Sequence, residues 1–514
     1  MGAVLAVLGL GSLFFLWTQL IKPQRTLPPG PKPLPLVGNI TNLTIKELWL
    51  RVTQWAQQYG DVVYVHVFGQ GLVFLNTYDA AVDLLEKRGA IYSDKPGLIM
   101  TGELCGCENM VAFTRYGDKA RRQRRLMQQA LSANSVRRYE PLMAVQTQEL
   151  LRNILLNPEE YIASIRRYAG GLTLSCIYGY QVRSNDDKFL TLAEECVDLL
   201  ANKIASGGGI WPVDVLPFLR HMPDWMPGAG FKRSAAQWKA KIEEFVDKPY
   251  EYVKESMRNG TALPCFCTTL LEEMQERCEK EIDAERDFDI RWAANSMYSA
   301  SIDTTLTVVM HFMLAMIKHP DVLAKAQAEL DSVVGSGRLP TMSDRPALPY
   351  LECVMSEVLR WGAAVPMSLP HRLMEDDVYN GMHIPKGSLV FANVWNMVRD
   401  PALFPDPHAF TPERYLAPAA DEATARRRDP RNYVFGFGRR RCPGLHLIES
   451  SLWMVMAAMV ATLDLSVALD AQGYAVEPTV EFQNAVFRTP SAFKCDIRPR
   501  SEQAVRLVRE AVDA

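Results

Sequence analysis

The stretch FGFGRRRCPGLHLIES, Phe435–Ser450, decides how the rest of the chain is interpreted. It places Cys442 in a glycine-rich, arginine-flanked loop directly before an apolar segment with helical spacing. Gly436 and Gly438 permit tight turns, and the helix expected from Leu445 would direct its positive N-terminal end toward the sulfur. Because positive charge and a helix N-terminus favour the thiolate form of cysteine, the loop predicts a metal ligand at Cys442.

The remaining cysteines carry no comparable signal. The chain has ten cysteines in 514 residues, scattered without CxxC pairs or the histidine-rich spacing of zinc sites. A chain of this length does not need disulfide bonds for stability, so nine of them are expected to be free thiols in a reducing compartment. A structural or redox cysteine is the alternative reading of Cys442 itself.

Charge and missing motifs exclude several classes of partner. A formal net charge of −3, without a basic or acidic tail, argues against a nucleic-acid-binding protein. No G-x-G-x-x-G motif follows a predicted strand, and no phosphate-binding loop is present, so no nicotinamide or flavin domain is expected. Electrons for any redox chemistry would have to come from another protein.

The amino terminus is expected to be a membrane anchor. Residues 1–21 are apolar almost throughout, and at 1.5 Å per residue such a helix spans a bilayer core of about 30 Å. Lys22 and Arg25 follow the segment, which places the body in the cytosol under the positive-inside rule. A cleaved signal peptide is the alternative, but the basic n-region and small-residue cleavage site that it needs are missing.

A proline-rich spacer, residues 22–35, joins the anchor to the body. It contains LPPGPKPLP, which can be neither helix nor central strand and is expected to be stiff and extended. The glycosylation sequons at Asn39, Asn42 and Asn259 would be unused in a cytosolic body. The expected location is therefore the endoplasmic reticulum membrane, with a single span.

Residues 36–514 read as one large domain, mainly helical with small peripheral sheets. Strand patterns occur at 61–76, at 378–392 with a turn at Asn380-Gly381, and at 480–497. One helix, expected from about Ile290 to Lys318, is far longer than the usual 11–12 residues and is expected to cross the core.

The centre of this long helix is unusually polar. Asp303, Thr304 and Thr305 are poor helix formers, because their side chains compete for backbone hydrogen bonds. The pattern is compatible with a hydrogen-bonded kink, or with a polar spot that faces a cofactor or an oxygen species.

The loop motif F-x-x-G-x-R-x-C-x-G, met by Phe435, Gly438, Arg440, Cys442 and Gly444, resembles the haem-binding loop of cytochromes P-450. The resemblance implies the cytochrome P-450 fold and a haem b whose iron takes Cys442 as its axial thiolate. It also implies that Phe435 packs beside the cysteine and that Arg440 reaches a haem propionate.

Other motifs follow in the order of that family, over essentially the whole chain. Glu357 and Arg360 resemble the family's E-x-x-R, and Arg414 lies in a segment similar to P-E-R-F. The resemblance implies that these three form a buried network that supports the haem loop. Arg372, in Pro-His-Arg, resembles an arginine that binds the propionates.

The long helix is similar to the family's A-G-x-D-T-T, which implies oxygen activation by Asp303 and Thr304. Two positions depart from the pattern. Ala120 replaces the tryptophan of W-R-x-x-R, so haem retention is expected to be weaker, although Arg124 remains as a propionate ligand. Ser301 replaces a glycine, which alters the local kink or adds a hydrogen-bond donor.

The resemblance also implies partners: dioxygen, membrane lipid and a membrane-bound NADPH–cytochrome P-450 reductase, with cytochrome b5 as a second electron donor. A basic surface for an acidic reductase is expected at Arg121, Arg122, Arg125, Arg439 and Arg441. Contacts with an apolar substrate are expected from Leu98 to Phe113, at Ala300 and Thr304, from Val365 to Leu369, and at Val486 and Phe487. Ordinary surface and core roles are the alternatives for each of these residues.

The predicted function is a haem-dependent monooxygenase that hydroxylates or epoxidises a hydrophobic small molecule. The segments PHRLMEDDVYNG and FGFGRRRCPG suggest a fungal enzyme of secondary metabolism or xenobiotic oxidation. A haem–thiolate desaturase, isomerase or dehydratase is the alternative within enzymes. A haem-binding sensor, or an anchored binding protein without haem, is the alternative outside them.

Overall fold

The structure is a computed structural model and describes residues 26–43, 46–205, 211–277, 283–478, 480–482 and 486–510. The expected anchor at 1–21 and the first part of the spacer lie outside the described residues. Residues 26–33 form neither helix nor strand, as their prolines predict, and Leu34 makes only an isolated bridge to Gly38.

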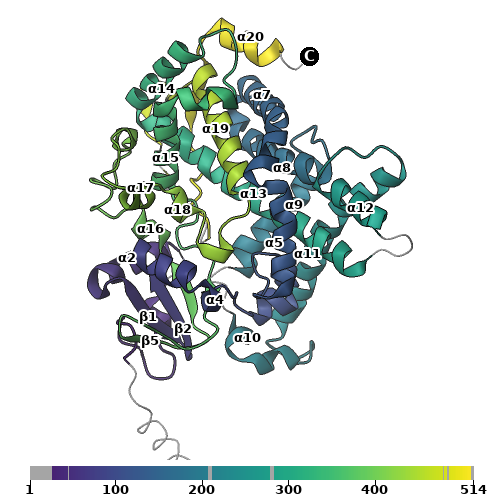
Figure 1. The fold of residues 1–514 in the computed structure, drawn as a ribbon, viewed down its shortest axis with the longest axis vertical. Helices are drawn as coiled ribbons and strands as arrows, with labels where there is room; N and C mark the ends of the chain where they lie inside the picture. The colour runs from purple at the N-terminus through teal and green to yellow at the C-terminus, as the bar shows by residue number, and fades with distance from the viewer. Residues whose placement is uncertain are drawn as a thin grey trace, which may run out of the picture.

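Helices make up most of the body (Figure 1). They are α2 (Leu48–Tyr59), α3 (Tyr78–Ala81), α4 (Gly89–Tyr92), α5 (Asp118–Leu131), α6 (Ala133–Val136), α7 (Glu140–Leu156), α8 (Tyr161–Tyr178), α9 (Lys188–Asp198), α10 (Pro212–Val215), α11 (Gly230–Arg258), α12 (Phe266–Arg277), α13 (Ala284–Lys318), α14 (Pro320–Val333), α15 (Pro349–Gly362), α16 (Val394–Met397), α17 (Glu422–Arg428), α18 (Arg431–Val434), α19 (Leu445–Thr462) and α20 (Glu502–Glu510).

The long central helix, α13, was predicted and is confirmed. It starts six residues earlier than the sequence pattern indicated, because Asp283 caps it by accepting hydrogen bonds from the backbone N–H groups of Glu285 and Arg286. It ends at Lys318, and Pro320 then opens α14. Figure 1 shows α13 crossing the middle of the molecule, with α5 and α8 beside it and α19 above.

The sheets are small and lie mainly at one side. The four-stranded sheet has the order β1 (Val62–Val67), β2 (Gln70–Leu75), β6 (Leu389–Ala392) and β3 (His371–Arg372), with β2 and β6 parallel. The β4 (Asp377–Tyr379) and β5 (Met382–Ile384) hairpin turns at Asn380 and Gly381, both with positive φ, as predicted. The first two strand predictions are therefore confirmed.

The third strand prediction, 480–497, is largely wrong. Among its described residues, 480–482 and 486–497, only the end is strand, β9 (Cys495–Pro499), and a single bridge joins Phe482 to Pro490. β9 pairs with β7 (Leu463–Leu469), which also pairs with the short β8 (Ala475–Val476). The sequence pattern did not separate β7, because it follows α19 without a turn between them.

Two of the three apolar cores in the described part of the chain border the cysteine loop. The larger core surrounds α13, and its packing partners come mainly from α8, α15 and α19. The smaller core lies under the four-stranded sheet, where Phe74 and Phe391 stack at 5.3 Å between ring centroids. Cys442 lies in the chain between α18 and α19, so its loop is fixed by both cores.

Within the described residues, α13 and α19 are long and apolar enough to cross a membrane. The apolar windows of these two helices are, respectively, 83% and 67% buried inside the protein. Their hydrophobicity is therefore accounted for by the core.

Candidate active site

The Cys442 loop is closed by its own backbone. The backbone N–H of Cys442 donates to the carbonyl of Phe435 at 2.8 Å, which brings the two ends of the motif together. Gly438 has a φ of +52°, and a Cβ built there would lie 2.3 Å from the carbonyl oxygen of Leu85. Only glycine permits this close approach, so the motif's glycine is explained by packing against the segment Val82–Lys87.

Two opposing effects act on the pKa of the Cys442 thiol. Desolvation by the surrounding protein raises the pKa of its thiol, although the residue keeps accessible surface, and this effect outweighs the opposing backbone N–H of Gly444 and the charges of Arg124 and Arg441. The start of α19 and the arginines therefore favour the thiolate, as the sequence predicts, and desolvation opposes them. A metal ion bonded directly to sulfur deprotonates a thiol, so these donors fit a metal-bound cysteine.

Several side chains near the middle of the molecule are accessible although the surrounding elements are buried. Cys442 is exposed, and so is Ala300 in the middle of α13, one turn before the half-buried Thr304. Their neighbours Ile302 and Leu306 are buried. Accessible positions inside a core helix indicate an internal hollow, and these positions are those expected to face the cofactor and substrate.

The acid–alcohol pair is in place on α13. The Thr304 hydroxyl donates to the carbonyl of Ala300 at 2.7 Å. Burial raises the pKa of Asp303, the positive charge of Arg166 opposes this shift, and the negative charges of Glu194 and Asp198 add to it. A carboxyl whose pKa is raised in this way is suited to carry a proton.

Ser301, the departure from the family's glycine, does not add a free donor to the site. Its hydroxyl donates to the carbonyl of Tyr298 at 2.9 Å and accepts from Thr173 of α8 at 2.9 Å. Both side chains are buried. The serine therefore ties the centre of α13 to α8.

Three cations lie together near the Cys442 loop: Lys95, which is buried, and Arg124 and Arg440, which are half-buried. Arg440 donates to the backbone carbonyls of Ser93 and Thr114 at 2.8 and 2.7 Å, and Arg124 donates to that of Arg441 at 2.6 Å. Lys95 donates to the carbonyls of Leu369 and Pro370 at 3.2 and 3.1 Å.

The negative charge of Asp94 acts on Lys95 and Arg440 without pairing directly with either of them. Burial, followed by the charge of Arg124, lowers the pKa of Arg440 to about 10. Burial also lowers the pKa of Lys95 well below its usual value, and the charges of Arg440 and Arg124 lower it further. Among the described residues, no carboxylate forms an ion pair with any of the three. Partly or fully buried cations are costly without partners, so the arrangement fits a bound group with two carboxylates, as haem has.

Lys95 was not predicted as a site residue. Nothing local in Ser93-Asp94-Lys95-Pro96 distinguishes it from a surface lysine, and only the fold brings it beside Arg124 and Arg440. Ala120 leaves no tryptophan at its position, and Lys95 is a further cation that could hold a carboxylate of a bound haem.

Arg372, in contrast, already has a partner. Its guanidinium donates to Asp94 at 3.3 Å, and Asp94 also accepts from Arg115 at 2.9 Å. Asp94 is buried, and its pKa is lowered although burial opposes this, because Arg115 and the N–H of Tyr116 stabilise the carboxylate. The structure therefore places Arg372 next to the cation group without leaving it unpaired.

The Glu357–Arg360–Arg414 network is formed as the motifs implied. Arg360 donates to both carboxylate oxygens of Glu357 at 2.7 Å, and neither side chain is exposed to solvent. Arg414 donates to Glu357 at 3.2 Å. Arg360 also donates to the carbonyls of Val398, Pro407 and Ala409, so the network holds α15 against the segment 398–414.

The segments expected to bind substrate converge on α13. Val111 donates its N–H to Ser296 at 2.9 Å, and the carbonyl of Val111 accepts from Arg440 at 3.3 Å, which ties the segment 98–113 to both α13 and the cysteine loop. The hydroxyls of Thr307 and Thr489 lie 2.6 Å apart, and the N–H of Arg488 donates to Ala364 at 2.9 Å.

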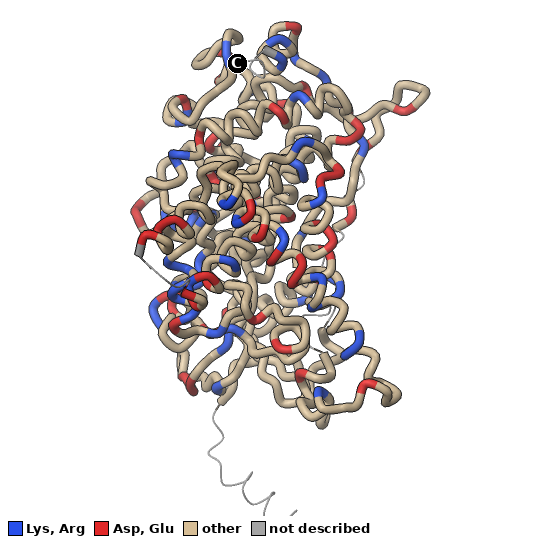
Figure 2. Tube along the Cα trace, turned by 90° about the vertical axis from the view of Figure 1, so that its right-hand side faces the viewer, with Lys and Arg blue, Asp and Glu red and all other residues tan. Residues whose placement is uncertain are grey.

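The expected basic surface is only partly free. Arg122 pairs with the buried Asp289 at 2.6 Å, and Arg441 donates to the carbonyl of Arg431 at 3.1 Å. Arg125 and Arg439 are exposed. Figure 2 shows basic and acidic residues mixed over the face that it displays, rather than one field of a single sign.

Taken with the helical body, the accessible cysteine and the three cations beside it define a haem–thiolate protein. A family model described as Cytochrome P450 matches residues 28–493. The chain belongs to the cytochrome P450 family, whose members use haem with an axial cysteine thiolate.

Relatives come from fungi. The chain is 42% identical over 491 residues to cytochrome P450 monooxygenase claT of Ampulloclitocybe clavipes, covering 96% of this chain and 95% of that protein. It is 38% identical over 511 residues to cytochrome P450 monooxygenase 176 of Postia placenta, covering 99% and 97%. It is 37% identical over 504 residues to claR of A. clavipes, covering 98% and 91%. These findings identify a cytochrome P450 monooxygenase.

We expect Glu357→Gln to be strongly destabilising. Breaking a buried pair by neutralising one partner costs about 3–5 kcal/mol, because Arg360 keeps its charge without compensation. Glu413→Gln is a matched control on the neighbouring segment, since Glu413 pairs with the exposed Lys325 and is expected to contribute about 1 kcal/mol or less. Thermal midpoints of the two variants check this, and equal midpoints would contradict the role given to Glu357.

Proposed function

We propose that this monooxygenase is anchored in the endoplasmic reticulum membrane and hydroxylates or epoxidises a hydrophobic small molecule. Fungal secondary metabolism is the favoured setting, with xenobiotic oxidation as the second. The proposal rests on one observation above all: Cys442 lies accessible beside cations with which no carboxylate of the described residues pairs directly. In this proposal Cys442 is the axial ligand, and Lys95, Arg124 and Arg440 hold the propionates.

When bound, thiolate-ligated haem supplies dioxygen activation, because the sulfur donates electron density that favours O–O cleavage. The protein must supply protons and keep bulk water away. Asp303 takes a proton from the side of Arg166 and Glu194, which face it, and passes it toward the Thr304 hydroxyl. Because the Thr304 hydroxyl donates to the carbonyl of Ala300, its oxygen is available to accept a hydrogen bond and would hold a proton donor beside the reacting centre.

Phe435 and Gly444 flank the cysteine in this proposal. The backbone of Phe435 closes the loop, and a Cβ at Gly444 would lie 3.7 Å from the Cys442 sulfur, in ordinary contact. The Asp303–Thr304 pair favours an oxygen-inserting enzyme over an isomerase or dehydratase, which need no oxygen activation. It also argues against a haem sensor, which needs no acid–alcohol pair.

Electrons are proposed to come from NADPH–cytochrome P450 reductase, with cytochrome b5 as a second donor. Arg121, Arg125 and Arg439 are exposed and are proposed to meet an acidic partner, although Arg121 also pairs with Asp118 at 2.6 Å and Arg439 donates to the Tyr116 hydroxyl. Arg122 and Arg441 are engaged within the protein and are no longer proposed as docking residues.

The membrane proposal is supported by exposed apolar side chains at one end of the body. Trp225 is 80% exposed and Phe218 65%, both close in sequence to α10. Leu36 is 92% exposed and Phe68, at the β1–β2 turn, 49%. Figure 1 places α10 and this hairpin at the same lower end of the molecule. Clustered exposed apolar residues at one end fit contact with lipid.

We expect the reduced protein to show a strongly red-shifted Soret band with carbon monoxide, and Cys442→Ala to abolish it. The band depends on sulfur ligation, so loss of the thiol removes it even if haem still binds. Cys495→Ala is the control, because that thiol lies on β9 and should leave the spectrum unchanged. A colourless wild-type protein, or a band retained in Cys442→Ala, would refute the assignment.

For Thr304→Ala we expect product formed per NADPH consumed to fall about tenfold or more, with peroxide released instead. Positioned proton transfer contributes about 10²–10⁴-fold to rates, so a misdirected proton should dominate the outcome. Thr305→Ala provides the comparison, since it removes a buried hydroxyl from the adjacent position. Unchanged coupling in Thr304→Ala would remove this hydroxyl from the mechanism.

In microsomes, we expect the full chain to resist carbonate extraction and to carry no glycan at Asn39, Asn42 or Asn259. An apolar span holds the protein against alkaline washing, and a cytosolic body never meets the glycosylation machinery. External protease should therefore degrade the body. Glycan attachment at any of the three sites would place the body in the lumen and overturn the proposed orientation.

A further inference from the structure

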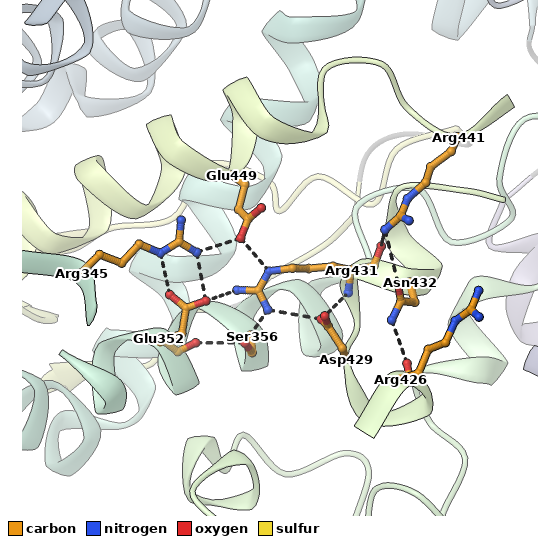
Figure 3. Close-up of polar contacts among 9 residues, drawn as sticks. All are labelled: Arg345, Glu352, Ser356, Arg426, Asp429, Arg431, Asn432, Arg441 and Glu449. Atoms are coloured by element: carbon orange, nitrogen blue, oxygen red, sulfur yellow. Dashed lines mark hydrogen bonds and ion pairs between the residues drawn. The ribbon is translucent and has the colours of Figure 1, made fainter. Parts of the chain in front are cut away.

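A cluster of charged side chains lies between α15, α18 and α19, next to the cysteine loop (Figure 3). We call it the Arg431 cluster; its members are Arg345, Glu352, Arg431 and Glu449. Arg345 belongs to the 3-10 segment Met342–Ala347, Glu352 to α15, Arg431 to α18 and Glu449 to α19. Four separate elements therefore meet in one group of charges.

Arg431 is the centre of the cluster. It donates to Glu449 at 3.1 Å, to the Ser356 hydroxyl at 3.1 Å and to Asp429 at 3.2 Å. It also pairs with Glu352. Its side chain is only 15% exposed, so these contacts are largely shielded from water.

Arg345 is the second positive side chain of the cluster, and it contacts the same two glutamates as Arg431. It donates to both oxygens of Glu352 at 2.9 and 3.0 Å, and to Glu449 at 2.8 Å. Burial alone would raise the pKa of Glu352, but Arg345 and Arg431 outweigh it and the pKa is lowered. Likewise, the pKa of Arg431 is raised despite burial, because Glu352 and Asp429 stabilise its charge. The opposite charges of the cluster therefore stabilise one another.

The cluster reaches Cys442 from both sides along the chain. On the preceding side, Arg441 donates to the carbonyl of Arg431 at 3.1 Å and to the Asn432 side chain at 3.3 Å. On the following side, Glu449 lies on α19. The backbone N–H groups of Gly444 and Leu445, at the start of this helix, lower the pKa of the Cys442 thiol. Arg431 thus connects the residue before Cys442 with the helix after it.

This connection differs from that of the Glu357 network. The hydrogen bonds of Arg360 end on the carbonyls of Val398, Pro407 and Ala409, which belong to a segment preceding α17. Arg431, in contrast, is the first residue of α18, and its backbone carbonyl accepts from Arg441, immediately beside the cysteine. Support behind a metal ligand fixes its position and is commonly needed for tight binding.

We propose that Arg431 is a positioning residue for Cys442, acting through Arg441 and α19 to hold the sulfur where the haem iron binds. Arg431 does not itself touch the cysteine; it fixes the two neighbours that do. The inference rests on the proposed role of Cys442 as axial ligand. It adds a second support for that ligand, separate from the motif network of Glu357.

The test compares Arg431→Gln with Arg500→Gln in the full-length, haem-loaded protein. Arg500 is a matched control, because it makes a bidentate pair with Asp331 at 2.7 and 3.0 Å and also donates to the carbonyls of Val460 and Ala461. It lies at the far end of α19 from Cys442. Three readouts are taken: thermal midpoint, the fraction of carbon monoxide complex with the red-shifted Soret band, and the rate of haem transfer to excess apomyoglobin.

We expect Arg431→Gln to lose a large part of the red-shifted band and to release haem about tenfold faster, as for other supports behind metal ligands. Arg500→Gln should lower the thermal midpoint and leave both haem readouts at wild-type values. A purely structural role for Arg431 would make the two variants alike. Unchanged band and haem release in folded Arg431→Gln would overturn the proposal.

Further variants cover the case in which Arg431→Gln does not fold. Arg431→Lys keeps the charge but not the branched contacts, and Glu449→Gln removes one partner; each should shift the haem readouts in the same direction by less. In an Arg441→Gln background, Arg431→Gln should add little, because coupled residues are not additive. Full additivity would show that Arg431 does not act through Arg441.

If the wild type lacks the red-shifted band, the assignment of Cys442 as axial ligand fails instead. This outcome is distinct from a failure of the proposed role of Arg431.

Discussion

Lys95, Arg124 and Arg440 repel one another in a region from which most water is excluded. Charges in such a region are tolerated when hydrogen bonds and an opposite charge compensate them, and here the backbone carbonyls supply only the hydrogen bonds. Asp94, the nearby carboxylate, is engaged with Arg115 and Arg372. Within the described part of the chain these cations therefore have no directly paired anion, an arrangement that fits an anionic group bound beside the cysteine loop, and the surrounding elements hold the cations in place against their repulsion.

Two ionic networks stabilise that region, and they differ in burial and in the segments that they join. The Glu357–Arg360 pair is fully buried and ties irregular backbone at 398–414 to α15, where unpaired carbonyls would otherwise be costly. The Arg431 cluster is partly accessible and joins short elements on either side of the cysteine. The first network maintains the fold of a long loop, whereas the second acts on the position of a single side chain.

Much of this could be predicted from the sequence, because the decisive signals are local. The cysteine loop, the length of α13 and the spacing of Glu357 and Arg360 are each contained within one segment, and each is confirmed in form. Lys95 could not be found, since its partners come from residues 124 and 440 and no local pattern marks it. The desolvation of Cys442 could not be predicted, because it depends on elements distant in sequence. The strand β7 was missed because no turn residue separates it from α19.

The hydrogen bond between Ser301 and Thr173 has a mechanical consequence. A glycine in the middle of a long helix leaves a point at which the helix bends easily, and here that point is occupied by a side chain tied to α8. The hydrogen bond therefore restricts bending at the middle of α13, and little adjustment to substrates of different shape can occur there. Changes in the shape of the substrate site must come from the surrounding segments instead, above all from the segment 98–113. Sequence differences that give this enzyme and its relatives different substrate preferences should therefore accumulate in loops rather than along α13.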